Sequence, residues 1–227
     1  MHPELGVLVT ARNEAARLPA TLGGLRRAFP GARMVVADDA STDGTAQVAR
    51  AGGMEVASAP RRLGKGGAAT LGARALLAGR RPRLVVLCDA DLGASAGALG
   101  ELAAAVDSDE ADVAVASFVR REGGGFGLAL GVARLAIARA TGGLRPRAPL
   151  SGQRALRASD LERLLPFAPG FGMEVGITIA AHRAGLRLIE IELPLAHRAT
   201  GRTAPGFLHR GRQLVDAVRA AGSFSRP

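Results

Sequence analysis

Short apolar runs recur along the first half of the chain, and each ends abruptly at a polar cluster. The clearest runs cover residues 5–10, 34–37 and 84–88. They are rich in Val and Leu, which is typical of buried β-strands. Segments with helical patterning separate them. This alternation predicts an α/β protein with a mostly parallel, doubly wound sheet and helices on both faces.

The remaining pattern extends the same architecture. It predicts further strands at residues 55–57, 112–117 and 186–193, and helices at 13–29, 45–51, 68–78, 95–107, 128–140, 160–165, 173–184 and 205–221. Asn13 is a suitable N-cap for the first helix. The apolar helix at 128–140 fits either the core or a membrane surface. No repeat or linker divides the chain, so we expect a single domain over residues 1–227.

Three polar clusters follow the predicted strands at their carboxyl ends. In a doubly wound sheet, ligands bind beyond these ends. We therefore expect the clusters to line one crevice. The clusters are Arg12-Asn13-Glu14, Asp38-Asp39 and Asp89-Ala90-Asp91.

Asp89 and Asp91 are one residue apart at the end of a predicted strand. Side chains alternate along a strand, so both carboxylates point to the same side. Two hard oxygen ligands beside a crevice suit Mg²⁺ or Mn²⁺, and such a metal suits a diphosphate. Alternatively, the two aspartates only end the strand and cap the next helix.

Asp38, Asp39 and Lys65 add two further candidate contacts. The carboxylates can accept hydrogen bonds from a base imide or ribose hydroxyls, or can cap the following helix. Lys65 lies between glycines before a predicted helix, where a phosphate is favoured. It is the only lysine of the chain, which suggests that arginine would not serve there. Its surroundings do not have the spacing of a nucleotide-binding P-loop.

The amino-acid composition limits which classes of binding partner, and which cellular compartment, we expect. The 227 residues include 30 Lys+Arg and 20 Asp+Glu, for a formal charge of +10, which fits anionic partners. Trp and Tyr are absent, so the aromatic stacking surfaces of many nucleic-acid-binding proteins are missing and we expect no nucleic acid. One cysteine, no signal-peptide pattern and no long apolar segment predict a cytoplasmic protein without a membrane span.

Four segments, taken in order and spacing, resemble the family-2 glycosyltransferases of the GT-A fold. They read VLVTARNEAARL, VVADDASTDGTAQVA, GKGGAATLGA and VVLCDADL. The later segments SGQRALR, GFGMEVGITIAAHRAGLRLIEIEL and HRATGR resemble the same superfamily, and are most similar to polyprenyl-phosphate sugar synthases and their soluble bacterial relatives. The resemblance implies a nucleotide-binding half over residues 1–120 and an acceptor-binding half over 121–227 with an Arg-rich tail.

The resemblance also implies roles for individual residues. Asp89-Ala90-Asp91 matches the DXD motif, which holds a divalent metal, Mg²⁺ or Mn²⁺, on the donor diphosphate. Lys65 and Arg154 would add positive charge there, and His197 would supply another metal ligand unless it is a plain surface histidine. Glu174 would be a catalytic base or a sugar-binding residue, or would only favour a helix N-terminus. The residues expected to bind the nucleotide sugar are Thr10, Ala11, Arg12, Asn13, Glu14, Asp38, Asp39, Lys65, Asp89, Ala90, Asp91 and Arg198.

Two positions depart from the family pattern. Arg12 stands where an aromatic is common, although arginine can also stack on a base. Gly93 stands where polyprenyl-phosphate enzymes often carry Gln, so metal coordination and acceptor can differ. Membrane contact would be peripheral, at the inner face of the plasma membrane, through the tail arginines. These are Arg198, Arg202, Arg210, Arg212 and Arg219.

These features predict a metal-dependent glycosyltransferase that uses a UDP- or GDP-sugar. The catalytic candidates are Asp91, Glu174 and Arg154, and the acceptor is unknown, with a lipid-linked phosphate or a cell-envelope glycan precursor as candidates. The first alternative is a nucleotidyltransferase that makes a nucleotide sugar, although the loop after the first strand lacks its Gly-rich pattern. The second is a non-catalytic nucleotide-sugar-binding protein.

Overall fold

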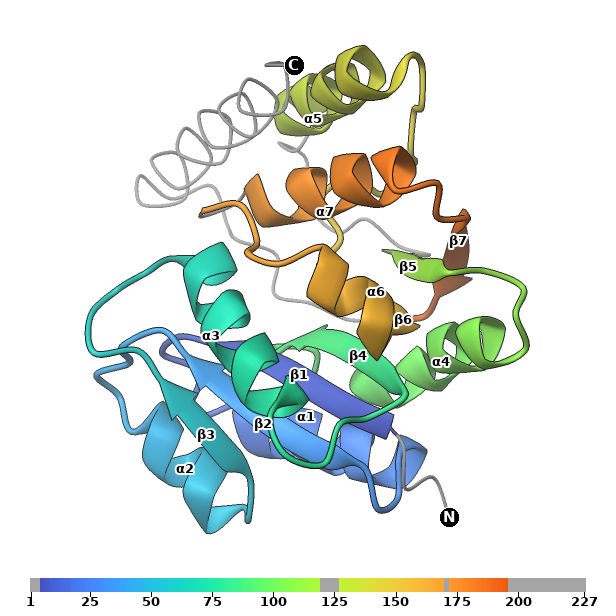
Figure 1. The fold of residues 1–227 in the computed structure, drawn as a ribbon. Helices are drawn as coiled ribbons and strands as arrows, with labels where there is room; N and C mark the ends of the chain where they lie inside the picture. Colours follow the sequence, from blue (N-terminus) through green and yellow to red (C-terminus); the bar gives the residue numbers. More distant parts are fainter. Residues whose placement is uncertain (1–4, 119–126, 170–171, 196–227) are drawn as a thin grey trace.

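The computed structural model describes residues 5–118, 127–169 and 172–195. Their strands form one sheet in the order β3-β2-β1-β4-β6-β5-β7, with helices on both faces (Figure 1). The strands are β1 (Leu5–Ala11), β2 (Arg33–Asp38), β3 (Glu55–Ser58), β4 (Leu84–Asp89), β5 (Val113–Phe118), β6 (Arg154–Arg157) and β7 (Leu188–Leu193). The helices are α1 (Leu18–Ala28), α2 (Thr45–Ala51), α3 (Lys65–Leu77), α4 (Gly100–Asp107), α5 (Gly127–Thr141), α6 (Ala158–Arg163) and α7 (Gly172–Arg183), with a 3₁₀ helix, η1 (Gly93–Leu99).

The mostly parallel, doubly wound sheet is confirmed. The helix predicted at residues 95–107 is divided into η1 and α4, and the helix predicted at 205–221 lies outside the described residues. Two further features differ from the sequence-based prediction. Strand β6 was not predicted, because its four residues give too short a pattern; it runs antiparallel between β4 and β5. The proposed N-cap at Asn13 is wrong, since α1 begins at Leu18 with Arg17 as its cap residue. Asn13 instead has a positive φ of 56° and belongs to the loop that precedes the helix.

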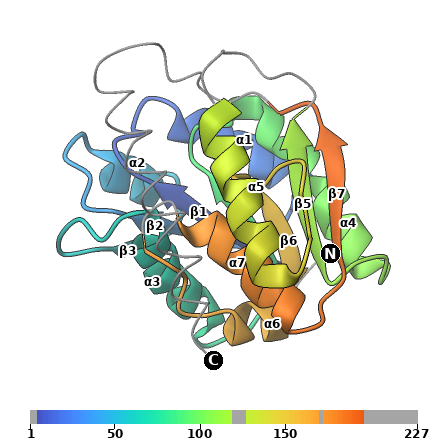
Figure 2. The same cartoon turned by 90° about the horizontal axis from the view of Figure 1, so that it is seen from above.

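Two apolar cores cover the two faces of the sheet. Helices α1, α2 and α4 pack on one face through residues such as Leu22, Ala49 and Leu102. Helices α3, α6 and α7 cover the other face, with Leu76 and Leu161 buried beneath them. Helix α5 packs on α7 and forms an outer layer above it (Figures 1 and 2). Within the described ranges, no helix is both long enough and apolar enough to cross a bilayer.

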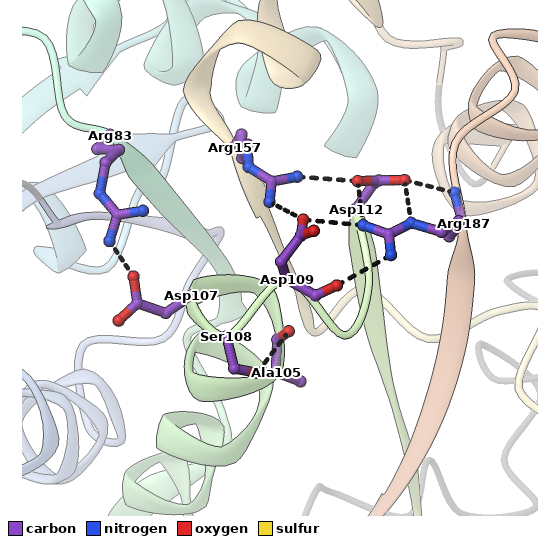
Figure 3. Close-up of polar contacts among 8 residues, drawn as sticks. All are labelled: Arg83, Ala105, Asp107, Ser108, Asp109, Asp112, Arg157 and Arg187. Atoms are coloured by element: carbon purple, nitrogen blue, oxygen red, sulfur yellow. Dashed lines mark hydrogen bonds and ion pairs between the residues drawn. The ribbon is translucent and has the colours of Figure 1, made fainter.

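A group of ion pairs, here called the acidic-turn cluster, joins β5, β6 and β7 at the sheet edge opposite the carboxyl ends of β1, β2 and β4 (Figure 3). It consists of Asp109, Asp112, Arg157 and Arg187. Asp112 accepts hydrogen bonds from Arg157 Nη1 at 2.8 Å and from Arg187 Nε at 3.0 Å. Asp109 Oδ1 accepts from Arg157 Nη2 at 2.6 Å and from Arg187 Nη2 at 2.9 Å. These bonds tie the acidic turn before β5 to the neighbouring strands.

Candidate active site

The three predicted polar clusters lie at one edge of the sheet. Thr10 of β1 pairs in register with Asp89 of β4, and Ala11 pairs with Asp38 of β2. The carboxyl ends of these three strands are therefore adjacent, as the sequence pattern predicts. Thr10 Oγ1 donates a 2.9 Å hydrogen bond to Asp89 Oδ1, which links two of the ends directly.

Asp89 is the centre of a charged network that includes Lys65 and Glu174. Lys65 Nζ lies 2.7 Å from Asp89 Oδ1 and 2.7 Å from Glu174 Oε1. Gln153 Nε2 donates to Asp89 Oδ2 at 2.9 Å. The network therefore joins the end of β4, the first residue of α3, the first turn of α7 and the segment before β6.

The pKa values of this network are set by burial and by charge pairing. Burial alone would lower the pKa of Lys65, but the charges of Asp89 and Glu174, with their hydrogen bonds, raise it above the ordinary value. Burial alone would raise the pKa of Asp89, but the charge of Lys65 and hydrogen bonds from Lys65, Thr10 and Gln153 lower it. At neutral pH the network contains an ammonium group and an ionised Asp89 held by it.

Gly152 leaves room for this ion pair. A Cβ atom at Gly152 would lie 2.5 Å from Lys65 Nζ and 3.0 Å from Asp89 Oδ2. Because the backbone passes so close to the ammonium, a wider cationic group has little space there. This close approach gives a physical reason for a lysine at position 65 in a chain whose other basic side chains, histidines aside, are all arginine.

Asp38 and Asp39 have different surroundings although they are adjacent. Asp39 accepts hydrogen bonds from the backbone N–H groups of Leu63 and Gly64, at 2.6 and 3.1 Å, and so fixes the loop before α3. Asp38 is 4% exposed; its Oδ2 accepts from Ser41 N at 3.3 Å, and its Oδ1 has no hydrogen-bond partner. A buried carboxylate oxygen without a partner is costly, so Asp38 is the candidate acceptor for a ligand donor.

The loop after β1 is held against the loop after β2. Asn13 Oδ1 accepts from Thr42 N at 2.9 Å, and Glu14 N donates to Thr45 Oγ1 at 2.9 Å. The side chain of Arg12 is exposed beside them. The loops after β1 and β2 therefore lie side by side next to Asp38.

The turn after β4 places Asp91 next to Asp89. Thr21 of α1 donates to Ala90 O at 2.7 Å and accepts from Gly93 N at 2.8 Å, which fixes the turn. Gly93 has a φ of 58°, a conformation that suits glycine. Gly93 thus serves the turn geometry here. Asp91 itself is half-buried.

The donor set fits a divalent metal that is shared with a substrate. No group of three His, Cys, Asp or Glu side chains suited to a metal occurs within the described ranges. Mg²⁺ commonly takes one or two carboxylates together with substrate phosphates and water, so Asp91 next to Asp89 is a sufficient protein contribution. Both oxygens of Asp89 already accept two hydrogen bonds or ion-pair contacts each. His197 and Arg198 lie outside the described residues.

Arg154 is fully buried next to the charged network. Its side chain is 0% exposed and donates to Ser151 O at 3.0 Å, Thr178 Oγ1 at 3.1 Å and Glu174 O at 2.9 Å. Burial lowers its pKa to about 10, against the charges of Glu174 and Glu190. The guanidinium holds the backbone on either side of the network, at Ser151 and Glu174. The prediction that Arg154 adds positive charge at the donor diphosphate stays a prediction.

Sequence reasoning did not identify Gln153 as a site residue. The residue occurs in the SGQR segment, but nothing in the pattern showed that β6 would insert beside β4 and bring this side chain to Asp89. Only the pairing of Leu87 with Arg154 across the two strands shows it.

Comparison with known proteins gives a consistent assignment. The family Glycosyl transferase family 2 matches residues 6–153. An undecaprenyl-phosphate mannosyltransferase of Micrococcus luteus is 33% identical over 230 residues, covering 93% of this chain and 91% of that protein.

Solved structures of glucosyl-3-phosphoglycerate synthase from Mycobacterium tuberculosis are also similar. The complex with Mn²⁺, UDP and phosphoglyceric acid has a TM-score of 0.77 at 26% identity, covering 96% of this chain and 78% of that one. The complex with Mg²⁺ and UDP has a TM-score of 0.75 at 25% identity, with 96% and 79% covered.

Proposed function

Because this chain belongs to glycosyl transferase family 2, we propose that the crevice at the ends of β1, β2 and β4 is its donor site. The protein is a metal-dependent glycosyltransferase that takes its sugar from a nucleotide-sugar donor. The observation that carries the proposal is the Asp89–Lys65–Glu174 network beside Asp91. The family match favours sugar transfer over the nucleotidyltransferase and the binding-protein alternatives.

Asp38 would bind the nucleoside part of the donor. Its buried Oδ1 is without a partner, and an imide N–H or a ribose hydroxyl would satisfy it. Arg12 and Asn13 border the same position, and the exposed guanidinium of Arg12 can stack on a base. We infer that the donor is a UDP-sugar or a GDP-sugar. The UDP bound in the similar structures favours the UDP-sugar.

Asp91 would hold the divalent metal together with oxygens of the donor diphosphate. When bound, a divalent metal acts as a Lewis acid that stabilises the negative charge on the leaving nucleoside diphosphate. Asp89 would stay paired with Lys65, whose ammonium keeps this carboxylate ionised and in place. Lys65 also adds positive charge beside the diphosphate.

Glu174 would bind a sugar hydroxyl and would not need to act as a strong base. Its side chain is buried and held by Lys65 at 2.7 Å. The relatives are named for acceptors that contain a phosphate, undecaprenyl phosphate in one and phosphoglyceric acid in the other. We propose an acceptor whose phosphate oxygen is itself the nucleophile, as in a polyprenyl phosphate, because that oxygen is already ionised and attacks without loss of a proton.

A thermal-shift screen of nucleotides and nucleotide sugars, with and without Mn²⁺ or Mg²⁺, tests this proposal. A ligand that binds only the folded state stabilises it in proportion to the logarithm of its saturation. We expect a metal-dependent shift with one nucleoside diphosphate and its sugar.

Asp91→Ala provides the matched variant for this screen. It should lose the metal-dependent part of the shift and keep the melting temperature of the unliganded protein within a few degrees. A full metal-dependent shift in Asp91→Ala would remove the metal assignment. A shift that requires nucleoside triphosphate plus sugar phosphate would favour nucleotidyl transfer.

A further inference from the structure

Helix α5 and the loop after it belong to a segment with an unusual charge pattern. Between Glu122 and Asp160 the chain contains six arginines and no acidic residue. Helix α5 forms the outer layer of the molecule, above α7 (Figures 1 and 2). Two of the six arginines do not contribute to the outer face, since Arg154 is buried and Arg157 belongs to the acidic-turn cluster. The other four lie on α5 and in the loop after it.

One face of α5 is buried and the opposite face is exposed. Ala133 and Ile137 pack against Val175 and Ile179 of α7. Leu135, by contrast, is 51% exposed, more than any other large hydrophobic side chain of the described residues. Arg139 is also exposed and lies four residues later, so it shares the face of Leu135.

The loop after α5 is fixed beside this exposed face. Arg134 of α5 donates from Nε to Pro146 O at 2.9 Å and from Nη2 to Arg147 O at 2.8 Å. Glu190 of β7 accepts from the backbone N–H groups of Arg147 and Ala148, at 2.8 and 2.6 Å. These bonds hold the exposed loop against both the helix and the sheet.

We group five residues as the basic surface: Leu135 and Arg139 on the exposed face of α5, Arg145 and Arg147 in the loop after it, and Arg183 at the carboxyl end of α7. All five side chains are exposed. Arg183 of α7 lies at the carboxyl end of α5, where it donates to Ala140 O at 3.5 Å. Glu190 pairs with Arg147 at 3.6 Å and neutralises one of the four arginines, so the surface keeps a net positive charge.

We propose that the basic surface docks the protein onto an anionic phospholipid bilayer. Arginine binds phosphate groups well, and clustered basic residues are attracted to anionic lipid surfaces. Leu135, which shares the exposed face of α5 with Arg139, can enter the boundary between head groups and acyl chains. The inference rests on the proposed function in one point: a lipid-linked phosphate acceptor is located in the bilayer that this surface would contact.

Charge complementarity favours lipid over other occupants. Residues 196–227 contain six arginines and one acidic residue, so the charge of this segment does not complement that of the basic surface. A single-stranded nucleic acid would normally be held by stacking aromatic side chains, and the chain has no Trp or Tyr.

Vesicle co-sedimentation of the full chain tests the docking surface. We expect binding to vesicles of phosphatidylglycerol mixed with phosphatidylcholine, little binding to phosphatidylcholine alone, and loss of binding as salt rises. Arg139→Gln/Arg145→Gln should weaken partitioning about thirty-fold, because each arginine near an anionic membrane contributes about fivefold. Leu135→Ser should lower the binding that remains at high salt several-fold.

Arg27→Gln/Arg80→Gln is the matched control, since both arginines are exposed and the charge change is equal. It should bind within about twofold of the original chain on the same scale. Equal binding of the two double variants, or a preference for an RNA oligonucleotide over anionic vesicles, would overturn the inference. Donor binding is measured in solution on the same preparations. An original chain that binds donor but no anionic vesicles would count against the docking surface alone and leave the proposed function in place.

Discussion

At the scale of single residues, Asp38 and Asp39 show how two adjacent carboxylates take different tasks. Both carboxylate oxygens of Asp39 accept hydrogen bonds from backbone N–H groups of the loop before α3. Oδ1 of Asp38, by contrast, is buried without a hydrogen-bond partner. Sequence alone predicts both as ligands or caps, because their pattern is the same. Only the placement of the Leu63 and Gly64 N–H groups separates them.

Asp38→Asn should therefore act mainly on nucleoside binding, and Asp39→Asn mainly on the free energy of unfolding. Asp38→Asn should weaken nucleoside binding about tenfold and leave the free energy of unfolding unchanged or slightly higher, since it removes a buried charge whose Oδ1 has no partner in the folded chain. Asp39→Asn should lower the free energy of unfolding by about 1–2 kcal/mol, because it weakens charged hydrogen bonds to backbone. Calorimetric binding and urea unfolding of both variants measure the contrast, and equal effects on binding would contradict it.

Lys65→Met should reverse the acid dependence of the network. In the original chain the depressed pKa of Asp89 contributes stability above its unfolded pKa, and this is lost as pH falls. Without the ammonium, burial raises the pKa of Asp89, so the variant should gain stability as pH falls.

At neutral pH Lys65→Met should cost about 3 kcal/mol, since it leaves a buried carboxylate without its counter-charge. Urea unfolding between pH 4 and pH 8, values chosen to lie around and above the usual pKa of about 4 for Asp and Glu, measures both effects. An unchanged slope with pH would show that Asp89 is not held by Lys65.

At the scale of elements, the sequence predicts most of the fold because each early strand ends at a polar cluster. Helix α2 was predicted with its observed bounds, Thr45–Ala51. The start of α1 could not be placed, since Asn13 is a good N-cap by type but is bound to Thr42 instead. The structural role of Arg154 could not be predicted either, because the sequence pattern around a buried arginine does not differ from that around a phosphate-binding arginine.

Gly66→Ala tests why the second residue of α3 is a glycine. A Cβ at Gly66 would lie 1.8 Å from Ala168 O, a backbone atom that cannot move alone. We expect a loss of about 2–4 kcal/mol in the free energy of unfolding. The matched control is Gly131→Ala in α5, where nothing lies within 4 Å, and which should be neutral or stabilising by up to about 1 kcal/mol. Similar unfolding midpoints for the two variants would argue against the close contact.

At the scale of the whole molecule, the acidic-turn cluster should contribute to the acid sensitivity of the fold. Hydrogen bonds from Arg187 and Arg157, opposed only partly by burial, lower the pKa of Asp112, and the same two arginines lower the pKa of Asp109. Depressed carboxyl pKa values contribute stability that is present above the unfolded pKa and lost as pH falls below about 4.

Asp112→Asn should remove much of this acid dependence and cost about 1–2 kcal/mol at neutral pH. Asp107→Asn is the control, because Asp107 pairs only with exposed Arg83 in this region (Figure 3) and should matter less. Thermal unfolding against pH compares them, and an equally steep acid loss in Asp112→Asn would contradict the role of the cluster.

The insertion of β6 between β4 and β5 has a consequence for how the protein is made. Strands β5 and β7 join the rest of the sheet only through β6, whose residues come about 65 positions after the end of β4. During synthesis, the edge of β4 stays unpaired until Arg154–Arg157 has left the ribosome. The nascent chain therefore exposes a hydrophobic strand edge for several seconds at ordinary elongation rates, an interval in which chaperones have their opportunity to bind.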